Sequence, residues 1–147
     1  MRLRLLDVNV LLALAWPNHP FHEISRSWFV RVAKQGWASC LLTEAAFVRL
    51  SSNSAVVPTA KPPIQCYRLL EELKRFGHHR FLSDQRISAA KVKDAVERCL
   101  GHQQVNDALL VLLAEVYDAL LVTFDGRLSP LASSPGTVEL LGADDHC

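Results

Sequence analysis

Apolar residues along the chain form short continuous runs that alternate with stretches of helical spacing. The runs predict buried strands over residues 3–7, 37–41, 78–83, 119–125 and 137–141. The helical spacing predicts helices over residues 9–15, 20–34, 44–50, 64–76, 88–100 and 104–117. Strands that alternate with helices predict an α/β sandwich with a mainly parallel central sheet.

Several residues mark the expected ends of these elements. Pro17 should end the first helix, since proline disfavours a helical residue before it, and Gly36 should end the second. We expect Thr43 and Ser88 to cap the helices that follow them. Residues 51–63, rich in serine and proline, predict a loop that is mobile or faces a partner. The last residues, GADDHC, are expected to fray.

Length and composition are typical of one globular domain. The chain has 147 residues, half of them hydrophobic, and we expect a single domain over residues 1–147. Its apolar runs are shorter than the roughly 20 residues that span a membrane, and its start does not resemble a signal peptide, so we expect a cytoplasmic protein. The four cysteines are scattered, which favours reduced, packed thiols.

Charge is balanced overall but unevenly distributed. The net charge is +1, and nine of the sixteen Lys and Arg residues lie between Lys61 and Arg98. Acidic residues are interleaved with them. The segment 61–98 therefore predicts either contact with phosphates or ordinary solvated helix faces.

Four acidic residues fall at the junctions between predicted elements. Asp7 ends the first strand, Glu44 follows the second, Asp107 lies in the first turn of a late helix, and Asp125 ends the run LLVTFD. In an open parallel sheet, strand ends and helix starts meet in one crevice where ligands bind. We expect these four carboxylates to gather there.

Each acid taken alone also has a structural explanation. Asp7 could cap a helix, Glu44 and Asp107 could favour helix N-termini, and Asp125 could begin a turn. Four converging carboxylates, however, would repel one another unless a cation neutralised them. Oxygen ligands favour Mg²⁺ or Mn²⁺, and such a site can hydrolyse phosphodiesters through an activated water.

Three polar residues nearby are candidates for supporting roles. Asn9 could hold a carboxylate or a metal-bound water, or cap the next helix. Thr123 points to the same face of its strand as Asp125 and could orient an acid. We interpret Asn106 as the cap of its helix.

The acidic segments together resemble a known family. LLDVNVLLAL, LLTEAAFVRL, VNDALLVLLAE and LLVTFDGRL are similar, in that order, to the four acidic motifs of PIN-domain ribonucleases, particularly the VapC-type toxins of bacterial toxin–antitoxin modules. HEISRSWF, at residues 22–29, is similar to a helix common in one branch of these toxins. The resemblance covers nearly the whole chain.

The resemblance implies a three-layer α/β/α fold and Mg²⁺- or Mn²⁺-dependent cleavage of structured RNA such as tRNA or rRNA. It implies that Asp7, Glu44, Asp107 and Asp125 form the catalytic and metal-binding quartet, with Asn9 and Thr123 in support. A homodimer and a VapB-type antitoxin are the implied partners. Some relatives have a further acid where Gly126 and Arg127 stand here, which leaves a second metal site open.

Other function classes fit the residues less well. A haloacid-dehalogenase-like phosphatase has a DxD motif after its first strand, where this chain has Asp7-Val8-Asn9 and lacks a partner lysine motif. A receiver domain has paired acids well before its strand aspartate, and Asp7 comes too early for that. A PIN-like module that binds RNA or protein without cutting is the non-enzymatic alternative. The acids themselves admit DNA as well as RNA.

Overall fold

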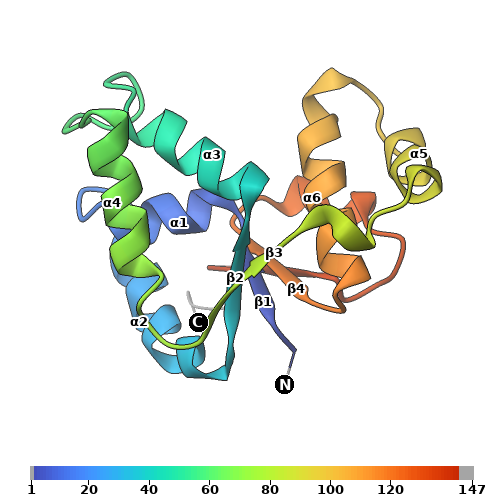
Figure 1. Ribbon diagram of the computed structural model, residues 1–147, viewed down its shortest axis with the longest axis horizontal. Coiled ribbons are helices and arrows are strands. Elements are labelled where there is room, and N and C mark those ends of the chain that lie inside the picture. The colour runs from blue at the N-terminus through green and yellow to red at the C-terminus, as the bar shows by residue number, and fades with distance from the viewer. Residues whose placement is uncertain (1, 143–147) are drawn as a thin grey trace.

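Five parallel strands form one sheet in the order β3-β2-β1-β4-β5 (Figure 1). The structure is a computed structural model and describes residues 2–142. The strands are β1 (Arg4–Leu6), β2 (Trp37–Cys40), β3 (His79–Leu82), β4 (Leu120–Thr123) and β5 (Val138–Leu140). All four strand pairings are parallel, which confirms the predicted sheet.

Helices cover both faces of this sheet and give a three-layer α/β/α sandwich (Figure 1). One face is covered by α1 (Val8–Ala15), α2 (His22–Val32), α3 (Leu41–Ser51) and α4 (Pro63–Leu73). The other is covered by α5 (Ala89–Glu97) and α6 (Val105–Val116). Short 3₁₀ helices are η1 (Ala33–Gln35), η2 (Asp84–Arg86), η3 (His102–Gln104) and η4 (Gly126–Leu131).

The central strands supply side chains to two hydrophobic cores. Leu6 and Val122 are fully buried against the α1–α4 layer. Their neighbours Leu5 and Leu121 are fully buried in the core that contains α6. Successive strand residues point to opposite faces, so neighbouring positions that are both covered are apolar, as at Leu5-Leu6 and Leu121-Val122, while Arg4 and Thr123 stand at strand ends. This is why β1 and β4 appear in the sequence as continuous apolar runs.

The start of α3 differs from the prediction. The second strand ends at Cys40 and α3 begins at Leu41, three residues before the predicted start at Glu44. Thr43 therefore is not the N-cap: it lies inside the first turn, where its hydroxyl accepts a hydrogen bond from the Cys40 amide at 3.1 Å. Leu41 is apolar and therefore extended the predicted strand by one residue, although its side chain is 73% exposed.

Two other helix starts test the predicted caps. Ser88 caps α5 as predicted, and its hydroxyl accepts a hydrogen bond from the Lys91 amide. Asn106 is not a cap, because α6 already begins at Val105 and Gln104 holds the N-cap position. The interpretation of Asn106 was wrong because the helix starts at Val105, two residues before the start that an Asn106 cap implies.

A glycine fixes the connection between α4 and β3. Gly77 has a φ of +61°, and a Cβ atom there would lie 2.3 Å from the Ala33 carbonyl oxygen. The amide of the next residue, His78, donates a hydrogen bond to that same oxygen at 3.0 Å. Only glycine allows this conformation and this close approach together. The contact sets where the chain enters β3.

Other expectations concern the loop, the thiols and the termini. Residues 52–62 connect α3 to α4, and Val57 anchors this connection in the core. Cys40, Cys66 and Cys99 are free thiols, as predicted. None of the helices in residues 2–142 is long and apolar enough to cross a membrane. The predicted fraying of the C-terminus concerns residues that, apart from Gly142, lie outside the described range.

Candidate active site

Three neighbouring strands and one helix position the four predicted acids. Asp7 follows β1 and Asp125 follows β4 by two residues, while Glu44 lies in the first turn of α3, directly after β2. Because β2, β1 and β4 are adjacent and parallel, their carboxyl ends meet at one edge of the sheet. Asp107 reaches this edge from the first turn of α6.

Asp7 is a buried carboxylate with two fixed hydrogen bonds. It caps α1, and its Oδ1 atom accepts a hydrogen bond from the Val8 amide at 2.7 Å. The Thr123 hydroxyl donates to its Oδ2 atom, also at 2.7 Å. Its exposed fraction is only 7%, and burial raises its pKa; the Asp125 carboxylate adds to that rise, while both hydrogen bonds oppose it. The side chain is thus held in one orientation.

Asn9 and Thr123 link the ends of β1 and β4. The Asn9 amide donates to the Thr123 hydroxyl oxygen at 3.1 Å, and the Asp125 backbone amide donates to the same oxygen at 3.1 Å. Since Asp7 holds the N-cap position of α1, Asn9 is not the cap. Of the roles that the sequence left open for Asn9, the structure supports steadying Asp7, and it does so through Thr123.

Asp107 and Asp125 complete a group of three interacting carboxylates. Burial raises the pKa of Asp107, and the charges of Asp7 and Asp125 raise that pKa further. Asp125 has the opposite shift, because hydrogen bonds from the Arg127 guanidinium lower its pKa. Arg127 Nη2 lies 2.7 Å from Asp125 Oδ2, and Arg127 Nε lies 2.9 Å from Oδ1. The structure therefore places Asp7, Asp107 and Asp125 near enough for their charges to interact.

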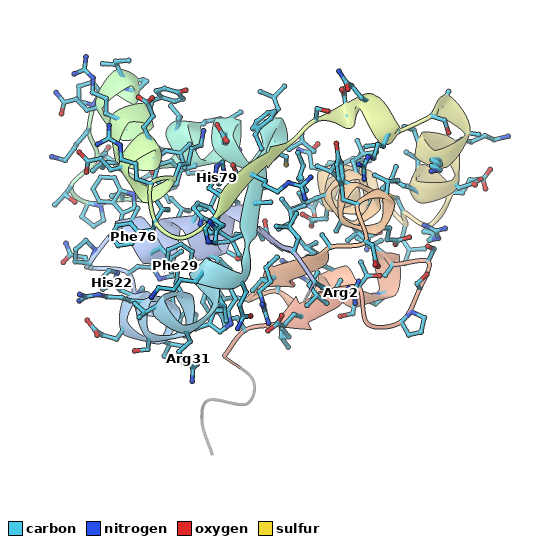
Figure 2. All side chains as sticks on the ribbon, turned by 60° about the horizontal axis from the view of Figure 1, so that its bottom comes forward. Arg2, His22, Phe29, Arg31, Phe76 and His79 are labelled. Carbon is cyan, nitrogen blue, oxygen red and sulfur yellow. The ribbon has the colours of Figure 1, made fainter. Side chains whose placement is uncertain are left out.

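Glu44 has a different set of partners, on the α3–α4 side of the site. Lys74 Nζ lies 2.7 Å from Glu44 Oε1, and the Ser39 hydroxyl donates to Oε2 at 2.6 Å. The Ser39 oxygen lies 2.7 Å from His79 Nε2. Because Ser39 donates its only hydroxyl proton to Glu44, it accepts this second hydrogen bond, and His79 Nε2 carries the proton. Figure 2 shows His79 where the chain passes from α4 into β3. Burial, followed by the charge of Lys74, lowers the pKa of His79.

These partners of the acids were not identified from the sequence. Ser39 could have been found, because it lies in a buried strand that otherwise consists of apolar residues. Lys74 and His79 come from elements far from Glu44 along the chain, and no spacing rule connects them. Arg127 was noticed only as a residue that replaces an acid, and not as the partner of Asp125.

The predicted basic segment 61–98 does not form a single surface. Its residues are distributed over α4, β3 and α5, and α4 and α5 cover opposite faces of the sheet (Figure 1). Moreover, Lys74 pairs with an acid of the site itself. Part of the segment 61–98 therefore lies beside the acids rather than on a separate basic surface.

The donor types at the site fit a hard divalent cation. Asp7 and Asp107 offer carboxylate oxygens, and neither forms an ion pair with a described Lys or Arg. Among residues 2–142, no three Asp, Glu, His or Cys side chains stand close enough to bind one ion together. Asp125 and Glu44 are turned to Arg127 and Lys74 instead, so both would have to leave these cations to join a shared ion.

A cavity of about 560 Å³ opens beside the acids. Asp107 and Arg127 form part of its wall, together with His102, Gln103 and Gln104. Its volume lies in the range of small-molecule sites, and its lining mixes these polar side chains with Leu100 and Leu131. Asp107 therefore adjoins a space that could accommodate part of a polar substrate.

Comparison with known proteins assigns the chain to a family. The family model described as PIN domain matches residues 4–133. The chain is 47% identical over 139 residues to Ribonuclease VapC38 of Mycobacterium tuberculosis. The matched region covers 93% of this chain and 96% of that protein. It is 40% identical over 140 residues to Ribonuclease VapC39 of the same species, covering 93% and 98%.

Solved structures show the same fold at low sequence identity. One is the structure of VapBC2 from Rickettsia felis bound to a DNA fragment from their promoter, with a TM-score of 0.60, 17% identity, and 95% and 98% of the two chains covered. Another is the structure of FitAB bound to an IR36 DNA fragment, with a TM-score of 0.64, 17% identity, and 93% and 94% covered. With these matches and its edge of acidic residues, the chain belongs to the PIN-domain family, among its VapC-type members.

Proposed function

We propose that this protein is a metal-dependent endoribonuclease and the toxin of a VapBC-type toxin–antitoxin module. The group formed by Asp7, Asp107 and Asp125 supports this proposal best. Asp7 and Asp107 are the more buried acids of this group, and neither has a cationic partner among the described residues. The names of the VapC relatives support ribonuclease activity. The likeness to the VapBC2 and FitAB structures supports a partner of the VapB type.

We assign the acids and their neighbours separate roles in cleavage. Asp7 and Asp107 would hold a Mg²⁺ or Mn²⁺ ion, with Asp125 and Glu44 joining them after leaving Arg127 and Lys74. When bound, such an ion lowers the pKa of a water molecule and stabilises the negative charge that develops on the leaving oxygen. Thr123 and Asn9 would keep Asp7 aimed at the reaction. The neighbouring cavity would receive a nucleotide next to the bond that is cut.

We further propose that the substrate is a structured RNA, tRNA or rRNA, whose cleavage arrests translation and growth. The active protein would be a homodimer in the cytoplasm, inhibited by its VapB-type antitoxin. These finer statements follow from membership of the VapC group, and each has its own test. Size-exclusion chromatography with light scattering measures the dimer, and sequencing of the 5′ ends of cleaved RNA after brief expression identifies the target.

The central test is cleavage of total RNA by the purified protein with Mg²⁺, with Mn²⁺ and with EDTA. We expect discrete products with either metal and intact RNA with EDTA. Asp7→Asn should abolish the products and relieve growth arrest while the protein stays folded. Full toxicity of that variant, or RNA binding without metal-dependent products, would overturn the proposal, and the second result would favour a binding module that does not cut.

A further inference from the structure

A lysine is held at the edge of the acidic site. Lys74 lies directly after α4, and its Nζ atom is 2.7 Å from Glu44 Oε1. The Glu44 side chain is 11% exposed and that of Lys74 is 20% exposed. The pair is thus largely covered by protein, and the Lys74 side chain retains a limited opening to solvent.

Glu44 does not depend on Lys74 for its orientation. Its other carboxylate oxygen accepts a hydrogen bond from the Ser39 hydroxyl, which is fully buried and in turn accepts from His79. Two strands therefore fix the carboxylate through an uninterrupted series of donors. Lys74 therefore adds positive charge beside Glu44, but it is not needed to orient the Glu44 carboxylate.

The helix that carries Lys74 does not depend on the ion pair either. α4 is docked by Cys66 and Leu70, both fully buried in the same hydrophobic core as Phe47 of α3. Burial of the large aliphatic side chain of Leu70 contributes about 1.5–3 kcal/mol, and Cys66 packs beside it as a small hydrophobic residue. A largely covered ion pair adds little net stability, because the desolvation of both charges offsets much of their attraction. Stability alone is a weak reason for a lysine at this place.

The charge of the site gives a stronger reason. Four carboxylates lie at this edge, and an RNA backbone must approach them although its phosphates are also negative. A lysine ammonium has three donors, and the Glu44 contact uses one of them. The centroid of the Tyr67 ring lies 5.8 Å from Nζ, and Tyr67 is 40% exposed.

We propose that Lys74 binds a backbone phosphate of the RNA beside the acids, and that Glu44 holds its ammonium group ready until the phosphate arrives. The inference rests on the proposed ribonuclease function and adds to it a specific substrate-binding residue. When Lys74 turns to the phosphate, Glu44 keeps its bonds to Ser39 and becomes available to a metal ion. Substrate binding and completion of the acidic site would thereby be coupled.

The test measures RNA binding without cleavage. The affinity of a fluorescein-labelled single-stranded RNA is determined by anisotropy in EDTA, at several KCl concentrations, for wild type, Lys74→Met, Lys74→Gln and Lys74→Arg. Lys74→Gln keeps a donor toward Glu44 and guards against a folding defect in Lys74→Met. Arg31→Met is the matched control, because Arg31 is an exposed cation at the end of α2, which leads to the opposite edge of the sheet (Figure 2).

Each phosphate contact on single-stranded nucleic acid contributes about 0.7 to the slope of log K against log salt concentration. We expect Lys74→Met and Lys74→Gln to lose about that amount of slope, and Lys74→Arg and Arg31→Met to keep the wild-type value. A purely structural role would lower the melting temperature without changing the slope. Wild-type slopes in both neutral variants, in a protein that cleaves RNA with Mn²⁺, would overturn this inference and leave the proposed function intact. A changed slope in a protein that never cleaves RNA would overturn the proposed function and leave Lys74 as an RNA ligand.

Discussion

The hydroxyl of Thr123 donates a 2.7 Å hydrogen bond to the carboxylate of Asp7, although 116 residues separate them in the chain. Thr123 is fully buried, and its oxygen also accepts from the side chain of Asn9 and from the backbone of Asp125. One hydroxyl therefore joins the two strand ends that carry Asp7 and Asp125. The geometry of the site depends on it.

Replacing this hydroxyl should impair both activity and stability. Thr123→Val keeps the shape of the side chain but leaves Asp7 Oδ2 without its donor, so we expect cleavage to fall about 10–100-fold. A hydrogen bond to a charged group contributes about 1.5–3 kcal/mol, which sets the expected loss in unfolding free energy. RNA cleavage rates and urea denaturation measure the two effects.

Thr137→Val is the matched control for this prediction. Thr137 is also buried, and its hydroxyl donates to the Ser134 carbonyl oxygen at 3.1 Å, outside the site. We expect this variant to lose about 0.5–1.5 kcal/mol and to cleave RNA at the wild-type rate. Equal losses of activity in the two variants would show that Thr123 acts only through general stability.

The raised pKa of Asp7 predicts that, without metal, ionisation of this carboxyl lowers the unfolding free energy as pH rises. Because the folded-state pKa lies above the ordinary value of 3.8, the folded protein binds the Asp7 proton more tightly than the unfolded chain does. The contribution of Asp7 to stability is therefore fully present below pH 3.8 and is lost as pH rises through the folded-state pKa. Asp7→Asn should be more stable than wild type at pH 7, and this advantage should shrink as pH falls.

Urea denaturation of both proteins in EDTA, at a series of pH values, measures this difference. Asn is also a good N-cap, so the substitution should not disrupt α1. An Asp7→Asn variant that is less stable than wild type at every pH would contradict the assignment of burial as the dominant influence on this carboxyl.

Metal binding should stabilise the folded protein in proportion to its affinity. A ligand that binds only the folded state raises the unfolding free energy by about 2.7 kcal/mol at one hundred times its dissociation constant. We expect Mn²⁺ to raise the melting temperature of wild type and to have little effect on Asp107→Asn. Asp94→Asn, an exposed acid on α5, should respond to Mn²⁺ as wild type does. An unchanged response of Asp107→Asn would exclude Asp107 as a ligand.

The glycine before β3 predicts a large loss of stability on substitution. Gly77→Ala combines a positive φ with a Cβ atom 2.3 Å from a backbone oxygen, so the chain around β3 must shift. We expect a loss of about 2 kcal/mol or more in urea denaturation. Gly101→Ala, where a Cβ atom would meet nothing within 4 Å, should change stability by less than about 0.5 kcal/mol. Similar values for the two variants would disprove the close approach.

The sequence predicted the sheet and the place of the acids because both depend on local patterns. Strands such as β1 and β4 are buried on both faces, which requires continuous apolar residues, and Asp7 and Asp125 stand where these runs end. The predicted helix boundaries were less accurate. Leu41 is apolar but exposed, so the pattern extended β2 by one residue and hid the true start of α3.

The partners of the acids could not be predicted in the same way. Lys74 is 30 residues from Glu44, and its place in the sequence is that of any lysine near the end of an amphipathic helix. Only the docking of α4 on α3 brings the two side chains together. The same applies to Asn9 and Thr123, whose contact requires β1 and β4 to be neighbours in the sheet.

The strand order also determines when the protein can become active during its synthesis. β1 is the first strand made, yet one of its two neighbours is β4, which is made only after α6. A nascent chain that has not reached residue 123 lacks the hydroxyl that orients Asp7, and one that has not reached residue 125 also lacks Asp125. Ribosome-bound fragments that end before residue 123 should therefore be unable to assemble the acidic site.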